Sequence, residues 1–587
     1  MNTHQNRIIK TKANRVEVKA SPGSGKTHIL IQRLQHLIST GVQAEQILVL
    51  SFSKIAVAEI RRRMLPVTTS RDLSKVTVST AHSFACWLIK RKVVLNDKAA
   101  ELLLSRAIKS VLKDCKKRVL WPDDPPDIRR RRLKLLDELS EPFQIMQVLR
   151  LLAFSRASRK NVAESLSGQF ETLRIYSRVL PVIRKRYSAL KKAKGAIDYG
   201  DMLVQAVTAI EGGASVPYTH ILVDEYQDCS AAQTHLLAQL GRLQGRSIMV
   251  FGDQHQGIFG FAGGGYMSLS NVLDGVREFT LPTSWRLTAQ TAALASAVAQ
   301  HSLKQAINTR RKGELPVLVT DSTLDNQTKH IVQDIQTLID GGTPPEQIVV
   351  LARIKALLNP IEQLLLARNV KTKRMGTIRN RKHVLRVLKL VRMVERCEQA
   401  KEKVMLKMLI KALPLIKDVD DEVCKKELLK LKKVSRVPSL EGRYRLCAGV
   451  YLRFMGGVRK NADLRADVSR WEPLCCGHND ARAMRAAVRA MSAKGVVTGT
   501  IHSAKGGEWD HVLVVGVTDG LLPLYLNRDD DISLIEERNL LYVAITRARD
   551  TVRLYHTPAN HARSRRRFKN VSRFLEESAV RKTLMLG

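Results

Sequence analysis

The sequence predicts an α/β protein built on parallel β-sheets and divided into several domains. Three apolar, strand-like segments each run directly into polar residues, at 16–20, 221–223 and 247–251. Because parallel sheets bind their ligands at the carboxyl ends of the strands, we expect these three endings to lie at one edge of one sheet. The chain has 587 residues, whereas a single hydrophobic core stops growing at roughly 250 to 300 residues. More than one domain is therefore expected.

The first strand leads into a glycine turn and then into a helical pattern of apolar residues. The turn reads Ser21-Pro22-Gly23-Ser24-Gly25-Lys26-Thr27. Gly23 and Gly25 let the backbone curl, so that its N–H groups and the positive end of the helix point at phosphate oxygens. Lys26 is expected to reach the β- and γ-phosphates, and the Thr27 hydroxyl to bind Mg²⁺. Ala20 stands where the strict motif begins with glycine, yet the strand, turn and helix together predict a nucleotide-phosphate site.

The second strand ends in the adjacent carboxylates Asp224 and Glu225. A nucleotide hydrolase needs one acid for the metal ion and another for the attacking water. We assign Asp224 to Mg²⁺ through its water shell, and Glu225 as the base that polarises the water. A lone Asp-Glu pair is usually exposed charge, but the combination with the glycine turn favours hydrolysis.

The third strand is followed by Gln256 and then by the rings of Phe259 and Phe261. Aromatic side chains beside glycines can present flat faces to single-stranded bases, a contact that tolerates any base sequence. Phe52, which follows another apolar run at 47–50, offers a similar ring. Packing in the core is the alternative interpretation of all three rings.

The chain carries 98 Lys and Arg against 55 Asp and Glu, for a net charge of +43 and a pI near 10.2. Dense basic runs lie at 129–132, 184–186 and 563–569. Such an excess suits a surface that follows a phosphate backbone, although any single run could be a solvated helix face. No apolar stretch long enough for a membrane span and no secretory signal is found, so we expect a cytoplasmic, DNA- or RNA-associated protein without membrane contact.

Further motifs appear in a fixed order along the chain. Gln5 precedes the glycine turn, Phe52 lies in the segment 47–54, and Thr80 and His82 lie in Thr80-Ala81-His82-Ser83-Phe84. With the glycine turn and the Asp-Glu pair, these segments make the chain similar to the UvrD/Rep group of superfamily 1A helicases. The resemblance implies that Gln5 reads adenine, that Phe52, Thr80 and His82 contact DNA, and that Gln256 senses the γ-phosphate.

The second half of the chain extends the resemblance. Residues 281–288 contain Trp285 and Arg286, residues 500–509 contain His502, Ser503 and Glu508, and residues 536–549 contain Arg547. By resemblance, Trp285 stacks on adenine and Arg286 and Arg547 contact the γ-phosphate. Glu508 is implied near the ribose, and His502 and Ser503 near DNA phosphates. The expected catalytic set is thus Lys26, Glu225, Gln256, Arg286 and Arg547, and the expected nucleotide-binding set adds Gln5, Ser21, Gly23, Ser24, Gly25, Thr27, Trp285 and Glu508.

The motif order implies two RecA-like parallel-sheet motor domains, each interrupted by a mainly helical insertion. The expected first motor domain spans 1–90 and 197–280 and is interrupted by 91–196. The expected second motor domain spans 281–375 and 495–587 and is interrupted by a short helical insertion at 376–494. ATP would then bind between two domains, and its hydrolysis would open and close them.

The resemblance implies an ATP-dependent DNA helicase or translocase that uses Mg²⁺ and moves 3′→5′ on single-stranded DNA. Single-stranded and tailed duplex DNA are the expected partners, and a nuclease or repair factor is an open possibility. Two alternatives stay open: a translocase that displaces proteins or serves a nuclease with little unwinding, and an ATP-gated nucleic-acid clamp that does not step.

Overall fold

The computed structural model describes part of the chain, in two compact units. The described residues are 3–64, 73–90, 93–117, 119–157, 161–162, 164–166, 173–259, 266–299, 306–375, 385–392, 395, 437, 439–454, 481–482, 484, 495–525, 531–560 and 567–586. Unit 1 comprises Met1–Asp321, Lys505–Glu508 and Gly516–Gly587, and unit 2 comprises Ser322–Ala504 and Trp509–Val515. The predicted motor-domain boundaries stay a prediction.

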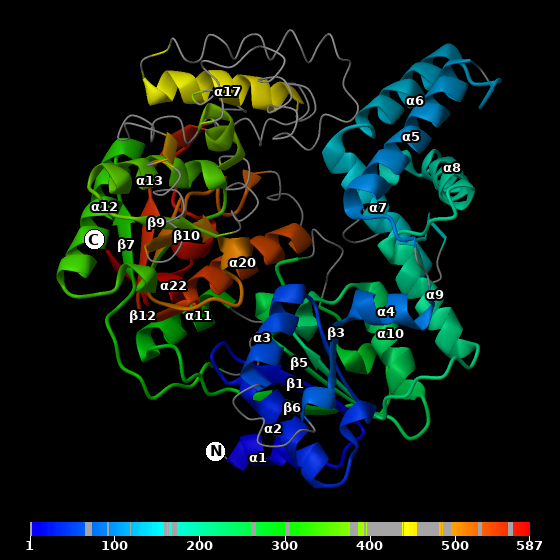
Figure 1. Ribbon diagram of the computed structural model, residues 1–587, viewed down its shortest axis with the longest axis horizontal. Helices are drawn as coiled ribbons and strands as arrows, with labels where there is room; N and C mark the ends of the chain where they lie inside the picture. The colour runs from blue at the N-terminus through cyan, green and yellow to red at the C-terminus, as the bar shows by residue number, and fades with distance from the viewer. Residues whose placement is uncertain are drawn as a thin grey trace. The chain divides into compact units, whose positions relative to one another are not determined.

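A six-stranded parallel sheet forms the centre of the amino-terminal part of unit 1 (Figure 1). Its strand order is β3-β2-β4-β5-β1-β6. The strands are β1 (Arg15–Ala20), β2 (Ile47–Ser51), β3 (Thr77–Thr80), β4 (His220–Asp224), β5 (Ser247–Gly252) and β6 (Arg277–Leu281). Every residue of β2 is buried, as expected of a parallel strand that is covered on both faces. The three strand endings predicted to share one edge belong to β1, β4 and β5, which are neighbours in this sheet.

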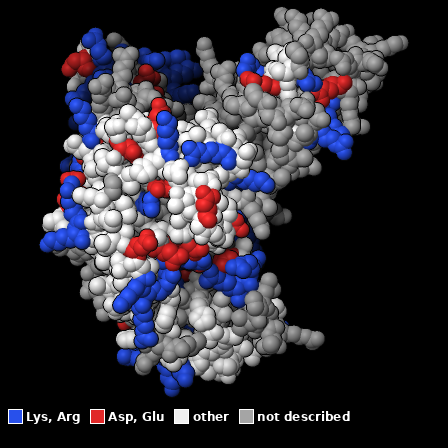
Figure 2. Space-filling view, turned by 90° about the vertical axis from the view of Figure 1, so that its left-hand side faces the viewer, with Lys and Arg blue, Asp and Glu red and all other residues white. Residues whose placement is uncertain are grey.

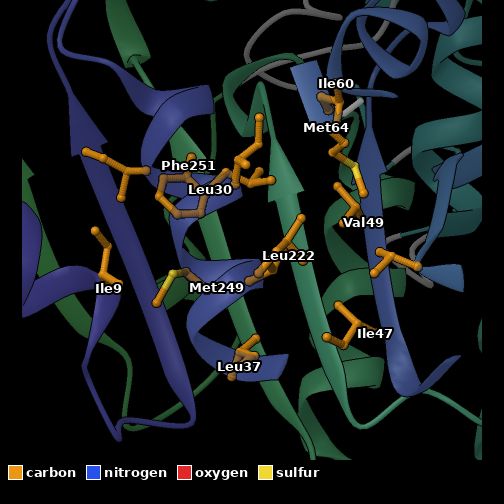
Figure 3. Close-up of a cluster of buried hydrophobic side chains, with 14 of the residues drawn as sticks. Ile9, Leu30, Leu37, Ile47, Val49, Ile60, Met64, Leu222, Met249 and Phe251 are labelled. Carbon is orange, nitrogen blue, oxygen red and sulfur yellow. The ribbon is translucent and has the colours of Figure 1, made fainter. Parts of the chain in front are cut away.

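Helices cover both faces of this sheet. One face packs against α1 (Thr3–Ile9), α2 (Lys26–Ser39) and α3 (Lys54–Met64), whose apolar side chains meet the strands in the cluster of Figure 3. The other face packs against α4 (Ala81–Leu88), α9 (Tyr199–Glu211) and α10 (Ala231–Arg242). Leu30 of α2 is fully buried in the first cluster, so its truncation to Ala would cost about 2 to 5 kcal/mol of stability.

The region predicted as the first helical insertion contains α5 (Asp97–Lys116), α6 (Pro126–Glu138), α7 (Pro142–Ala157) and α8 (Leu180–Ala193). These helices share a hydrophobic cluster of their own. An ion-pair network ties the end of this region to the first turn of α9: Lys191 of α8 pairs with Asp198 at 2.6 Å and also contacts Asp201. Asp198 and Asp201 form the capping box of α9, so the same carboxylates both start that helix and hold the insertion.

Parallel strands recur in the second half of the chain. Unit 2 contains β8 (Ile348–Ala352), β9 (Thr372–Arg374), β10 (Val496–Thr500) and β11 (Trp509–Val515), in the order β11-β8-β10-β9. Its helices are α12 (Leu324–Asp340), α13 (Leu358–Ala367) and α17 (Leu440–Phe454). Apart from α17 and a few other residues, among them the helical stretch 385–392, the predicted insertion 376–494 lies outside the described residues.

The carboxyl-terminal part of unit 1 adds the parallel strands β7 (Val317–Thr320), β12 (Ala548–His556) and β15 (Met585–Leu586). Its helices are α11 (Ala289–Ala299), α20 (Asp531–Ile545), α21 (Arg573–Glu576) and α22 (Ser578–Arg581), beside the antiparallel pair β13 (Ala559–Asn560) and β14 (Arg567–Phe568). The predicted fold class, α/β with two parallel-sheet regions, is confirmed. No helix in the described ranges combines the length and the apolar character that crossing a membrane requires.

Candidate active site

The glycine turn joins β1 to α2 as the sequence predicts. Gly23 and Gly25 adopt φ values of 71° and 83°, in the left-handed region that favours glycine. Helix α2 begins at Lys26, and no side chain caps its amino terminus. The backbone N–H groups of the first turn therefore remain available to an anion, which is the usual way in which a helix start binds phosphate.

Gly23 also lies against the segment that contains Trp285 and Arg286. A Cβ atom at Gly23 would lie 2.5 Å from the Arg286 Cβ and 2.8 Å from the Ser284 Oγ. The Trp285 backbone N–H donates to the Gly23 carbonyl at 3.0 Å, while 55% of Trp285 is exposed. Two segments that are distant in sequence thus meet at the turn, and an accessible indole lies beside it, while the contact of Trp285 with adenine stays a prediction.

The paired carboxylates lie at the end of β4, next to the glycine turn. Thr27 Oγ1 donates to Asp224 Oδ2 at 3.4 Å. Glu225 follows in a left-handed conformation, with φ at 56°. Such a backbone is uncommon for a residue with a side chain and is often kept where function requires it. The strand ending therefore separates the two acids, so that Asp224 faces Thr27 and Glu225 takes a different direction.

Burial and neighbouring charge move the pKa values of the two acids in opposite directions. Burial, together with the charge of Glu225, raises the pKa of Asp224. Burial also opposes ionisation of Glu225, but the positive charges of Lys26 and Lys505 outweigh it and lower the pKa of Glu225. Glu225 is therefore ionised at neutral pH, which is the form that can accept a proton from water.

Polar side chains connect β4 to the turn that follows β5. The Gln227 amide donates to Glu225 Oε2 at 2.5 Å, and its oxygen accepts the Asp253 N–H at 3.1 Å. Gln256 donates to Asp253 Oδ2 at 2.8 Å and accepts from Arg547 Nη2 at 3.3 Å. The predicted base and the predicted γ-phosphate sensor therefore belong to one hydrogen-bonded group.

The two predicted arginines lie in the same neighbourhood. Arg286 donates to Glu508 Oε2 at 2.7 Å and to the Thr546 carbonyl at 3.0 Å. Arg547 is 2% exposed and donates to the Val543 carbonyl at 2.9 Å. Burial and the charge of Arg286 lower the pKa of Arg547 to about 9. Arg547 is thus enclosed by protein groups. The N–H groups of Arg286 are bound by a carboxylate and a carbonyl, and a phosphate could replace both of these partners.

The structure also brings in residues to which the sequence alone assigned no role. Lys505 pairs with Asp228 at 2.6 Å, and the exposed fractions of the two side chains are 8% and 2%. Burial raises the pKa of Asp228 to about 6, although the charge of Lys505 opposes the shift. Arg549 donates to the second oxygen of Glu508 at 2.6 Å. The only sequence signal for these residues is their position inside motifs whose other members were assigned.

The predicted DNA-contacting residues of unit 1 lie near one another. Phe52 and Phe259 stack with ring centroids 5.4 Å apart and an interplanar angle of 22°, and both are half-buried. Thr80 caps the start of α4 by accepting the Ser83 N–H. The ring of His82 contacts that of Tyr199, at 5.2 Å between centroids. Phe261 lies outside the described residues.

A cavity of about 740 Å³ adjoins these residues. Phe52, Thr80 and His82 line it from the sheet side, and Arg150 and Phe154 of α7 line it from the helical region. Basic and acidic side chains are interspersed over the described part of the face in Figure 2.

The remaining predicted residues belong to other elements. Gln5 lies half-buried on α1, the helix that packs against α2. His502 and Ser503 belong to unit 2, in the short 3-10 helix Ile501–Ala504, where the Ser503 N–H donates to Thr500 Oγ1 at 3.3 Å. Ser503 is exposed. The predicted DNA contacts of His502 and Ser503 stay a prediction, as do those of Phe52, Thr80 and His82.

The residues at the strand ends fit a nucleotide with a hard divalent cation. A hydroxyl and a carboxylate, Thr27 and Asp224, are oxygen ligands of the kind that Mg²⁺ takes, and they lie in contact. Ser24 Oγ is buried beside them in the glycine turn without a protein partner. Within the described ranges, no group of three or more His, Cys, Asp or Glu side chains is placed to hold a metal ion.

Comparison with known proteins matches two regions of the chain to helicase family models. Residues 1–274 match the UvrD/REP helicase N-terminal domain, and residues 485–558 match the UvrD-like helicase C-terminal domain. The chain is 26% identical to the ATP-dependent DNA helicase UvrD2 of Mycobacterium tuberculosis, over 95% of this chain and 78% of the relative. It is 21% identical to the ATP-dependent DNA helicase PcrA of Staphylococcus aureus, over 98% of this chain and 86% of that relative.

Proposed function

The chain belongs to the UvrD/Rep family of ATP-dependent DNA helicases, and from this premise we propose that it moves 3′→5′ along single-stranded DNA and displaces the paired strand ahead of it. The motifs on which the proposal depends occur along nearly the whole chain, and the two family models match residues 1–274 and 485–558. In this proposal, the motor domains have the boundaries predicted from the motif order.

The proposed chemistry uses the side chains at the strand ends of the first sheet. Lys26 and the N–H groups of the α2 amino terminus bind the phosphates, and Glu225 orients and deprotonates the attacking water. Arg286 and Arg547 stabilise the negative charge that spreads over the transferred phosphoryl group. Gln5 and Trp285 bind adenine, and Glu508 binds the ribose after releasing Arg286.

Mg²⁺ is proposed to bind through Thr27 and Asp224, and when present it would neutralise charge on the β- and γ-phosphates. The protein's own contribution is to present two oxygen ligands in contact, at 3.4 Å from each other. Burial raises the pKa of Asp224, because it disfavours an uncompensated negative charge, and a bound cation would compensate that charge.

The observation that carries the proposal is the hydrogen-bonded path from Glu225 to Arg547. It passes through Gln227, Asp253 and Gln256. Gln256 is buried, and Phe259 follows it after a short turn. A change at the γ-phosphate can therefore move the segment that carries a base-stacking ring, which is what a motor requires.

The test is strand displacement on DNA and RNA duplexes with a 3′ or a 5′ single-stranded tail. We expect ATP-dependent displacement of DNA duplexes with a 3′ tail, and little displacement of the other substrates. The Glu225→Gln variant is the control, since it should bind the tailed DNA and leave it paired. Preferential displacement from 5′ tails would overturn the proposed polarity. Turnover that does not rise with single-strand length would instead favour an ATP-gated clamp.

A further inference from the structure

A segment that begins at Asn308 runs beside the loop that carries Arg286. The Ser284 N–H donates to the Asn308 carbonyl at 2.7 Å. Farther along, the Ala289 N–H donates to the Arg311 carbonyl at 2.7 Å. Backbone hydrogen bonds thus join the two stretches on both sides of Arg286, and the second stretch brings the side chain of Arg311 next to that loop.

The side chain of Arg311 joins two parts of the chain that are distant in sequence. Its Nη1 atom donates to the backbone carbonyl of Arg286 and, at 2.9 Å, to that of Arg549. Its Nη2 atom donates to Asp550 Oδ1 at 2.7 Å. A guanidinium presents its N–H donors in a rigid, planar fork. The two backbone carbonyls are therefore held at a fixed separation by one side chain.

These contacts close a ring of residues around Arg286. Glu508 accepts from Arg286 Nε at 2.7 Å and from Arg549 Nη2 at 2.6 Å. Arg311 in turn binds the backbone carbonyls of both arginines. Arg286 is therefore supported at two places, at its guanidinium by Glu508 and at its backbone by Arg311.

The two supports of Arg286 differ once a γ-phosphate is present. A phosphate would take N–H donors that bind Glu508 and the Thr546 carbonyl in this structure. The contact with Arg311 uses the carbonyl of Arg286 instead, and a phosphate does not compete for a carbonyl because both are acceptors. Arg311 is therefore the support that persists while Arg286 acts on the nucleotide.

The glycine turn limits how far the Arg286 backbone can shift. A Cβ atom at Gly23 would lie 2.5 Å from the Arg286 Cβ, and the Trp285 N–H donates to the Gly23 carbonyl at 3.0 Å. A small displacement of this backbone would redirect the Arg286 side chain beside the phosphate turn. Misplacing a catalytic group by about 1 Å can cost about 100-fold in rate, so a residue that fixes this backbone can matter for hydrolysis.

We propose that Arg311 is a positioning residue for ATP hydrolysis, which keeps the Arg286 guanidinium aimed at the γ-phosphate by holding the backbone carbonyls of Arg286 and Arg549. The inference rests on the proposed function, in which Arg286 contacts the γ-phosphate. Arg311 itself contacts neither the nucleotide nor the metal in this proposal. The exposed fractions of the Arg311 and Asp550 side chains are 41% and 43%. Because ion pairs this exposed contribute little to stability, variants at Arg311 should fold.

The experiment compares Arg311→Met and Arg311→Lys with Arg310→Met, which removes the neighbouring exposed arginine. ATP hydrolysis at saturating single-stranded DNA gives kcat, and competition by ADP gives the affinity for a nucleotide without a γ-phosphate. For Arg311→Met we expect kcat to fall about tenfold while the affinity for ADP stays parental. Arg311→Lys should recover part of kcat, since an ammonium is a point charge without the fork. Arg310→Met should behave like the parent.

A double-mutant cycle separates the positioning of Arg286 from any other effect of Arg311. In the Arg286→Ala background, Arg311→Met should lower kcat no further, because the group that it positions is gone. Losses that multiply in the double variant would overturn the proposal. Parental kcat in Arg311→Met, or an equal loss of ADP affinity, would overturn it as well. If Arg286→Ala alone kept the parental kcat, the proposed function of Arg286 would be wrong, and the role of Arg311 with it.

Discussion

The nucleotide site and the predicted DNA track hold their side chains in different ways. Asp224, Gln256 and Arg547 are each less than 5% exposed, and their partners come from distant segments. Phe52 and Phe259 are half-buried and stack on each other, and Phe52 also lines a cavity. Charge stabilisation requires a fixed, water-poor geometry, whereas a sequence-independent grip requires accessible flat faces. The same unit provides both.

The largest effect is expected when a charged group of the nucleotide site is removed. Lys26→Ala should lose phosphate binding and Glu225→Gln should lose the base, so each should lower ATP turnover by about 10²- to 10⁴-fold. Steady-state hydrolysis with saturating single-stranded DNA measures ATP turnover. The control is Glu314→Gln, which makes the same change of charge as Glu225→Gln at an exposed position. Near-parental turnover in both variants would place the chemistry elsewhere.

A second change tests how tightly the nucleotide site is packed. Gly23→Ala should weaken ATP binding by about tenfold, because strain of roughly 1 to 3 kcal/mol at a left-handed position is joined by a clash. The clash is with the Arg286 Cβ, 2.5 Å from the added atom. Gly213→Ala is the control, since Gly213 has φ 84° and open space around it. Equal ATP affinity in the two variants would mean that the contact with Arg286 does not matter.

The ring pair should respond differently from the nucleotide site. Replacing Phe52 and Phe259 with Ala should lower translocation per ATP by roughly tenfold, since base stacking contributes about 1 to 3 kcal/mol per base. Turnover at saturating DNA should change much less, because the hydrogen-bonded residues stay in place. Both are measured on strands of increasing length. A double variant that translocates normally would show that the rings only pack against each other.

The smallest expected effect is the response to salt, which should differ between DNA binding and ATP binding. Each phosphate neutralised on a single strand should contribute about −0.7 to the slope of log affinity against log salt. The KM for ATP should shift less, because the site's charges are partly buried and less screened. Fluorescence titration with single-stranded DNA and steady-state kinetics at matched salt concentrations test this. If DNA affinity and the KM for ATP changed equally with salt, the two regions would not differ in electrostatic screening.

Sequence patterns located the glycine turn and the paired acids well because their determinants are local. The strand, the glycine turn and the helix start are adjacent in the chain, and the structure has them at β1, Gly23 to Gly25, and α2. The Asp-Glu pair likewise follows its strand directly, at the end of β4. By contrast, Lys505 and Asp228 are distant in sequence, and nothing in the pattern indicates that they pair.

The sequence by itself therefore determined the fold class, the glycine turn and the acid pair, because strand length, apolar runs and glycine positions act over a few residues. Only the tertiary structure decided that Glu225 takes a left-handed backbone, that Phe52 stacks on Phe259, and that Lys505 reaches Gln256. These features depend on which strand ends become neighbours and on which side chains lose water together. That is a property of the packed sheet and not of any one segment.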